Sequence, residues 1–424
     1  MAIELLSPAG NYEKLVTAFS YGADAAYMGL TSFSLRKNAG NFSQEEISKV
    51  RKLKEESWKR IYCTMNILFS EKQIEALHEM RDEIASWPFD AFIVSDLGTV
   101  PFFKKYFPEK ELHLSTQASC INSEAARMYR DMGFSRIILG REASLDDIKR
   151  IKDKVPKLEL EAFVHGAMCM AYSGRCLLSA HLAGRSGNQG DCAHTCRWKY
   201  RLALEEEERP GVYFPIDEEE DYTTILSSKD LCMIDHVKEL EDAGLSSLKI
   251  EGRMKSVYYV AVVTRAYRKA IDKDADLDRY KRDIFDVSHR EFTTGFFFSS
   301  GPVEGSDVSR PTSYGYERNY IFLGTVLREA GDGVYELDVR NQIRKDSLLE
   351  FIGPDVPILS AESREWSTQP LIVPLLSAEG FTLLDGEGNA VDKLDHGKPG
   401  FIRTDLSLRP GYIMRTLSEE KYIR

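Results

Sequence analysis

The sequence has no long hydrophobic run, and this absence excludes an ordinary membrane-spanning helix. Its nearest candidate, 257–263 (VYYVAVV), is much shorter than the 18 or more apolar residues that a span requires. The first residues, MAIELLSPAG, contain neither a basic start nor a long apolar stretch, so we do not expect a signal peptide. We therefore expect a cytoplasmic protein without a membrane partner, in a compartment where thiols stay reduced.

An excess of basic charge is missing as well. The net charge is −11, which argues against a protein that coats nucleic acid without specificity. Much of the acid lies in two runs, 205–208 and 217–221, and the rest of the chain is close to neutral. A local basic surface is therefore compatible with this composition.

Cysteine is scarce, yet most of it is clustered. The chain has seven cysteines in 424 residues, and five of them occur in sequence between 169 and 232. In a reducing compartment such a cluster favours metal binding over disulfides. The clustered residues are Cys169, Cys176, Cys192, Cys196 and Cys232, whereas Cys63 and Cys120 lie elsewhere.

The spacing of the clustered cysteines excludes the commonest metal motifs. The pattern C-x6-C-x15-C-x3-C matches neither the paired C-x2-C of a zinc ribbon nor the C-x2-C-x2-C of a ferredoxin. Four thiolates from loops can still hold an iron–sulfur cluster or a zinc ion. Inert buried cysteines are the alternative.

Short apolar runs alternate with amphipathic stretches over the first 271 residues. Each run is apolar on both faces, as buried parallel strands are. The spacing of apolar residues between the runs predicts helices, which begin at capping boxes over 43–46, 70–73 and 144–147. The runs cover 3–7, 25–30, 60–66, 91–96, 112–117, 136–140, 158–166 and 247–252.

Eight such units, the last closed by a helix over 256–271, predict an α/β fold of the TIM type, a (β/α)8 barrel. A doubly wound open sheet is the competing architecture. Beyond residue 310, short alternating strands separated by Gly, Asp and Pro turns predict a small antiparallel β-barrel. These strands are expected over 319–339, 346–354, 370–376, 381–391 and 399–406.

We therefore predict two domains, 1–309 and 310–424. The first carries the cysteines in an insertion at 166–246. Within this insertion, 198–204 and 222–228 are expected to pair as a hairpin, with the acidic segment 205–221 as its loop.

Polar residues stand at the predicted strand ends, where the working site of such a barrel lies. Their mixed charge suits a small anionic ligand, although a salt bridge or a helix cap is an alternative role for each. The cysteine segment begins where the seventh strand ends, so we expect it to cover the same face. The polar residues are Ser7, Asn66, Asp96, Gln117, Arg141, Glu142, His165, Lys249, Glu251 and Arg253.

The stretch from Glu161 to Ser179 resembles the signature of a known family. Its segments EAFVHGAMC (161–169), GRC (174–176) and LS (178–179) agree at every defined position with peptidase family U-32, the collagenase-like peptidases. LLSPAG, NQGDCAHTCRWKY, ILSSKDL and SLKIEGRMKS are similar to that family too. The resemblance covers essentially the whole chain.

The resemblance implies an oxygen-inserting enzyme with a four-iron cluster. The chain is most similar to the branch of prephenate-dependent tRNA hydroxylases, which make 5-hydroxyuridine at the anticodon wobble position. It thus implies tRNA as partner, prephenate as co-substrate and a [4Fe–4S] cluster as cofactor. The implied cluster ligands are Cys169, Cys176, Cys192 and Cys232, with Cys196 as the alternative fourth ligand.

The same resemblance implies a catalytic set near the cluster: His165, Arg175, Lys249, Glu251 and Arg253. A dicarboxylate such as prephenate needs paired cations, and we assign this role to Arg175, Lys249 and Arg253. Glu251 is expected either to carry a proton or to orient Arg253.

Two groups of basic and aromatic residues are candidates for RNA contact, since RNA binding needs positive charge and stacking surfaces. One group is Arg185, Arg197, Trp198, Lys199, Tyr200 and Arg201, and the other is Arg253, Lys255, Tyr258 and Tyr259. A solvated basic edge is the simpler alternative.

Two other functions remain open. A collagenase-like peptidase could use Cys169 with His165, although the sequence has no H-E-x-x-H and no recognisable triad spacing. Alternatively, the chain could be one subunit of an oxygen-independent hydroxylase of the ubiquinone type, working with a paralogous partner protein.

Overall fold

The computed structural model describes residues 3–30, 33, 42, 46–168, 178–185, 192–198, 203–205, 213–215, 229–299, 316–354, 380–418 and 422–423. None of the helices in these ranges is long and apolar enough to cross a membrane. The predicted domain boundary at 309/310 lies outside the described residues.

Eight parallel strands form a closed barrel, as predicted. Each strand pairs in parallel with the next, and β11 closes the ring by pairing with both β7 and β1. Closure rules out the open sheet. The strands are β1 (Glu4–Pro8), β2 (Ala25–Gly29), β3 (Arg60–Met65), β4 (Ala91–Val94), β5 (Glu111–Leu114), β6 (Arg136–Ile138), β7 (Glu159–Ala167) and β11 (Ser247–Ile250).

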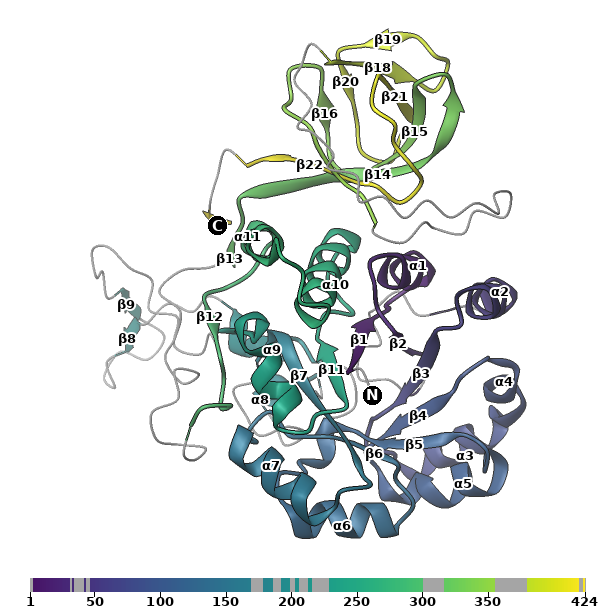
Figure 1. Ribbon diagram of the computed structural model, residues 1–424, viewed down its shortest axis with the longest axis vertical. Helices are drawn as coiled ribbons and strands as arrows, with labels where there is room; N and C mark the ends of the chain where they lie inside the picture. The colour runs from purple at the N-terminus through teal and green to yellow at the C-terminus, as the bar shows by residue number, and fades with distance from the viewer. Residues whose placement is uncertain are drawn as a thin grey trace.

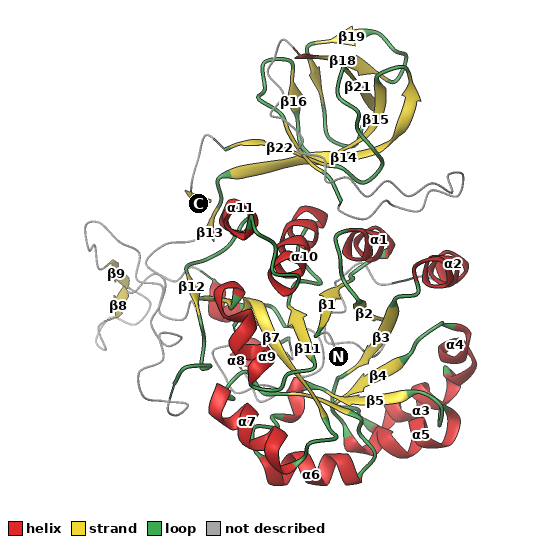
Figure 2. Ribbon diagram, viewed as in Figure 1, coloured by secondary structure: helices red, strands yellow, loops and turns green. Residues whose placement is uncertain are grey.

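Helices surround the barrel on its outside (Figure 2). Their starts follow local capping chemistry: the predicted boxes at Ser70 and Ser144 are both present, and Ser256 caps α10 through the backbone N–H of Tyr259. Ser43, of the third predicted box, lies outside the described residues. The helices are α1 (Tyr12–Ser20), α2 (Ile47–Ser57), α3 (Glu71–Glu79), α4 (Arg81–Ser86), α5 (Val100–Tyr106), α6 (Ser123–Asp131), α7 (Leu145–Lys154), α8 (Leu178–Ala183), α9 (Val237–Asp242), α10 (Val257–Ile271) and α11 (Leu277–Asp286).

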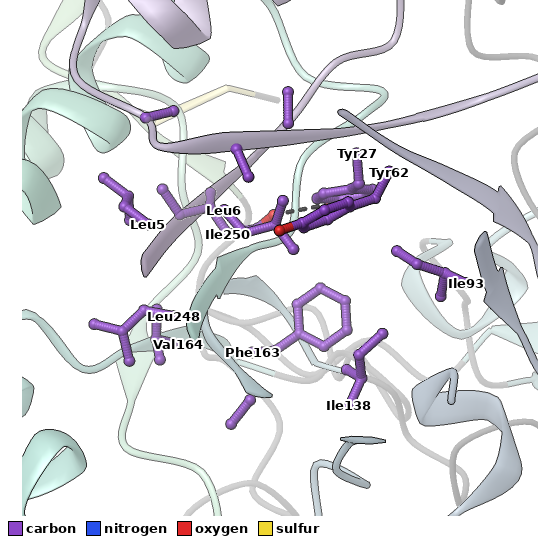
Figure 3. Close-up of a cluster of buried hydrophobic side chains, with 14 of the residues drawn as sticks. Leu5, Leu6, Tyr27, Tyr62, Ile93, Ile138, Phe163, Val164, Leu248 and Ile250 are labelled. Carbon is purple, nitrogen blue, oxygen red and sulfur yellow. Dashed lines mark hydrogen bonds between the residues drawn. The ribbon is translucent and has the colours of Figure 1, made fainter. Parts of the chain in front are cut away.

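The barrel interior is filled by large side chains rather than left as a pore. Figure 3 shows Tyr27, Tyr62 and Phe163, from three different strands, gathered at its centre. The hydroxyl of Tyr27 donates to the carbonyl oxygen of Ile250 at 2.8 Å, so its polar end is satisfied inside the apolar core.

The C-terminal part is an antiparallel sheet that curves around its own buried side chains (Figure 1). Seven strands follow the order β17-β22-β14-β15-β21-β18-β19, and two shorter pairs, β16–β20 and β13–β23, accompany them. The expected strand at 370–376 lies outside the described residues. The strands are β13 (Tyr316–Glu317), β14 (Tyr320–Gly331), β15 (Val334–Val339), β16 (Ile343–Arg344), β17 (Glu350–Ile352), β18 (Phe381–Asp385), β19 (Ala390–Val391), β20 (Lys393–Leu394), β21 (Gly400–Thr404), β22 (Ile413–Leu417) and β23 (Tyr422–Ile423).

This sheet packs against the helices that close the barrel. Ile352 and Ile413 belong to the same buried cluster as the barrel core. The hydroxyl of Tyr21, at the end of α1, lies 2.9 Å from the carbonyl oxygens of both Ile352 and Gly411. The contact therefore combines apolar burial with satisfied polar groups.

The hairpin predicted within the insertion is wrong at its loop, part of which forms a strand. β8 (Ala203–Glu205) pairs with β9 (Tyr213–Pro215), which lies inside the segment expected to be the loop. Tyr213 and Phe214 separate the two acidic runs, and such aromatic residues favour a strand. Residues 221–228 lie outside the described residues.

Candidate functional site at the barrel mouth

The cysteine segment leaves and rejoins the barrel at one point. β10 (Asp230–Cys232) runs antiparallel to the end of β7, and its other neighbour is β12 (Phe292–Thr293). Asp230 stands opposite Ala167, and Cys232 stands opposite His165. The two ends of the insertion therefore lie side by side at the strand-exit face of the barrel.

Gly166 makes this junction possible. Its φ is +98°, and a Cβ atom there would lie 2.6 Å from the carbonyl oxygen of Glu251 and 2.9 Å from the hydroxyl of Tyr259. Only glycine accepts both this backbone conformation and this close approach. β7 can therefore pass directly against the loop that carries Glu251.

The three described cysteines of the insertion are free thiols, as are Cys63 and Cys120. Cys192, Cys196 and Cys232 are half-buried, and the backbone N–H of His194 donates to the Cys192 sulfur at 3.4 Å. Such thiols fit a soft metal centre. Cys169, Cys176 and Arg175 lie outside the described residues, and the described residues alone contain no metal-binding group of three His, Cys, Asp or Glu side chains.

The two cysteines outside the cluster are core residues. Cys63 lies in β3 and Cys120 before α6, both within the main hydrophobic cluster. Burial raises the pKa of the Cys120 thiol to about 11, and it does the same for Cys232, so packing rather than pKa distinguishes the core cysteines. Both are therefore structural.

His165 packs against α10 and β12. Along β7 the side chains of Glu161 and Phe163 face the barrel interior. The register between β7 and β11 shifts after Lys249, and this irregularity turns His165 away from the interior. Its Nδ1 lies 3.4 Å from the hydroxyl of Tyr267. Burial lowers the pKa of His165 to about 3, so the imidazole is neutral at physiological pH.

A buried ion network crosses the barrel interior. The ammonium group of Lys249 lies 2.8 Å from Glu161, and Arg136 contacts both Glu161 (3.1 Å) and Glu4 (2.5 Å). Tyr62 donates to the second oxygen of Glu4 at 2.6 Å. Burial lowers the pKa of Lys249, while Glu161 opposes this shift. The charge of Lys249 is thus already balanced by a neighbour inside the barrel.

Two arginines and a glutamate lie just after the C-terminal ends of β6 and β11. Arg141, after β6, lies 3.4 Å from the Glu251 carboxylate, and its guanidinium stands 4.2 Å from the centre of the Phe163 ring. Arg253, after β11, is buried and donates to the hydroxyl of Thr64 at 3.0 Å. By the barrel mouth we mean Arg141, Glu251 and Arg253, which follow β6 and β11 at the strand-exit end of the barrel.

Arg141 has unused hydrogen-bonding capacity. Its side chain is only 7% exposed, and within the described part of the chain its Nε has no hydrogen-bond partner. A buried guanidinium N–H without a partner is costly, and an anionic ligand would satisfy it. In charge and in hydrogen-bonding capacity, Arg141 therefore suits a small carboxylate.

The structure corrects one group of proposed RNA contacts. Tyr258 and Tyr259 are each only 4% exposed, because α10 is covered on all sides, so neither ring can stack on a base. Lys255 lies between the rings of Tyr259 and Tyr316. Trp198 is 45% exposed, and it remains available for stacking.

The role of Glu161 was not predicted from the sequence. It is fully buried and holds both Lys249 and Arg136. The signal was present, because a carboxylate within an apolar strand requires a buried cation. Its partner on β6 could not be inferred without the closed barrel.

Comparisons with known proteins agree with the signature at β7. The pattern that describes peptidase family U32 matches residues 10–307. The tRNA hydroxylation protein P of Escherichia coli (strain K12) is 33% identical over 424 residues, which cover 90% of this chain and 92% of that protein. The protein of the same name from Helicobacter pylori (strain ATCC 700392 / 26695) is 41% identical over 333 residues, which cover 77% and 79%.

A third relative carries a different name. The collagenase of Porphyromonas gingivalis (strain ATCC BAA-308 / W83) is 32% identical over 383 residues, which cover 85% of this chain and 89% of that protein. All three relatives match far more than the signature alone. The chain thus belongs to peptidase family U32.

Proposed function

We propose that this chain is a tRNA hydroxylase that converts the wobble uridine to 5-hydroxyuridine, with prephenate as co-substrate and a [4Fe–4S] cluster as cofactor. The observation that carries the proposal is the similarity, over most of the chain, to relatives named for tRNA hydroxylation in two distant bacteria. The barrel mouth supports it, because buried arginines there suit a dicarboxylate.

In this proposal Cys169, Cys176, Cys192 and Cys232 hold the cluster, which supplies electron transfer when bound. Cys232 is fixed in β10 beside the point where the insertion begins. The free thiols of Cys192 and Cys232 support this assignment through their chemistry.

The protein's own side chains position the co-substrate. Arg141 and Arg253 bind its carboxylates, and the Glu251 carboxylate orients Arg141, from which it is 3.4 Å away. Lys249 is paired with Glu161 and lies 5.3 Å from the centre of the Phe163 ring, so it supports the site from inside the barrel rather than contacting the co-substrate. The ring of neutral His165 packs against Tyr267 of α10 and Phe292 of β12, and its backbone stands opposite Cys232 of β10.

The direct test is nucleoside mass spectrometry of tRNA from a strain that lacks this protein. We expect 5-hydroxyuridine and its derivatives to disappear and to return when the wild-type gene is restored. An unchanged nucleoside profile in the deletion strain would contradict the proposed reaction.

Replacing Arg141 with methionine should weaken prephenate binding about tenfold or more, because a lost charge-assisted hydrogen bond costs about 1.5–3 kcal/mol. Isothermal titration calorimetry measures this affinity without requiring turnover. Arg127→Met is the matched control, since Arg127 is an exposed residue of α6 that pairs with Glu124. Equal affinity in the Arg141 and Arg127 variants would remove Arg141 from the co-substrate site.

A collagenase-like peptidase is the second candidate, favoured by the relative named collagenase. Gelatin cleavage that survives complete removal of metal, and is lost on replacing one cysteine or histidine, would support this function over the first.

A further inference from the structure

A cleft separates α11 from the C-terminal sheet. It has a volume of about 460 Å³ and is lined from the barrel side by α11 and from the other side by β14, β17 and β22. Figure 1 shows α11 directly beneath β22 and β14. The cleft is thus built from both parts of the chain, and it shares no lining residue with the barrel mouth.

The floor of the cleft is a closed ion network. Arg415, which is buried, contacts Asp283 at 3.0 Å, Glu350 at 2.9 Å and Asp286 at 3.5 Å. Arg265 contacts Asp283 from the opposite side at 2.6 Å. The carboxylates of the cleft are therefore occupied by internal cations, which largely offset their charge.

At the rim of the cleft, by contrast, two positive charges are not neutralised by neighbours in the described part of the chain. Arg279 and Arg282 both line the cleft and are three residues apart on α11, so they project from neighbouring positions of one helix face. Within the described part of the chain, neither guanidinium has an ion-pair or hydrogen-bond partner. By contrast, the arginines with the same spacing on α6 are paired, Arg127 with Glu124 and Arg130 with Asp131.

Aromatic rings accompany the two free arginines. Phe285, on the same helix, is 49% exposed. Tyr320 lines the opposite wall, with the Arg415 guanidinium 4.0 Å from its ring centre on one face. Unpaired arginines beside accessible rings are the combination by which proteins bind RNA backbone and stack on its bases.

We propose that this cleft is a second RNA-binding site, in which Arg279 and Arg282 contact phosphates of the tRNA substrate. The inference rests on the proposed function, because it takes tRNA as the substrate. The chain as a whole is acidic, so binding needs local cations that are not already neutralised. The rim of the cleft supplies such a pair.

The test compares tRNA binding by the full-length protein and its Arg279→Glu/Arg282→Glu variant. The probe is tRNA from the deletion strain, followed by fluorescence anisotropy over a range of KCl concentrations. We expect affinity to fall about tenfold or more at low salt. The slope of log affinity against log salt should decrease by about 2, one for each lost phosphate contact.

The control is Arg127→Glu/Arg130→Glu on α6, which changes the same charge at the same spacing and should leave affinity and slope near wild type. Arg279→Gln/Arg282→Gln removes the cations without adding repulsion, so it reports on the cleft if charge reversal impairs folding. If the glutamine variant kept the wild-type affinity and salt dependence, the cleft would not be an RNA-binding site, but the proposed function would be unaffected. A wild-type protein that does not bind tRNA would overturn the proposed function as well.

Discussion

Replacing Glu161 with glutamine is expected to lower the free energy of unfolding by about 3–5 kcal/mol, the usual cost of leaving a buried charge without its partner. The change keeps the volume of the side chain but leaves Lys249 and Arg136 facing a neutral amide. Urea unfolding followed by circular dichroism measures the loss.

An exposed ion pair provides the control for this prediction. Glu124 pairs with Arg127 on the surface of α6, and such pairs contribute only about 0–1 kcal/mol. Glu124→Gln should therefore leave the unfolding transition almost unchanged. If Glu161→Gln lowered the free energy of unfolding equally little, the interior ion network would not stabilise the barrel.

Because of this network, the difference in free energy of unfolding between the wild type and Glu161→Gln should depend on pH. Burial alone would raise the pKa of Glu161, but Lys249 and Arg136 outweigh it and hold the pKa below its ordinary value. A carboxylate with a lowered pKa stabilises the fold fully above its unfolded pKa, about 4.3, and loses this contribution as pH falls through the folded value. The stability gap between the two proteins should therefore be full at neutral pH and shrink below about pH 4.

The barrel was predictable because each of its strands is buried on both faces. Runs such as 91–96 contain little but apolar and β-branched residues, and the polar capping residues between them mark the helix starts. Local chemistry therefore specifies most barrel elements. Of the predicted strand-exit residues, Arg141 and Glu251 lie 3.4 Å apart. Lys249 instead pairs inside the barrel, and His165 packs against α10.

Contacts between distant segments were not predictable in the same way. Tyr258 and Tyr259 follow a basic loop at the start of an apolar run, and both are buried. The C-terminal sheet packs on this part of α10, with Phe322 stacked on Tyr258. β22, which carries Arg415, was missed because its run IMRTL is short and interrupted by a charge. That charge is buried against α11 and β17, which no local pattern reveals.

The largest effect on activity should come from the cluster ligands, and the fourth ligand can be assigned by a pair of variants. Cys232→Ser is expected to reduce bound iron from about four atoms per chain to less than half and to abolish tRNA hydroxylation. Cys196→Ser should retain both. The reason is position, because Cys232 is held in β10 next to the start of the cysteine insertion.

Iron analysis of anaerobically purified protein and nucleoside mass spectrometry provide independent readouts. Cys120→Ala is the control, since this thiol is buried in the core away from the insertion and its loss should leave iron content unchanged. Loss of iron with Cys196→Ser instead would make Cys196 the fourth ligand. Full iron content in both serine variants would show that neither thiol binds the cluster, and the fourth ligand would then have to be a residue other than Cys196 and Cys232.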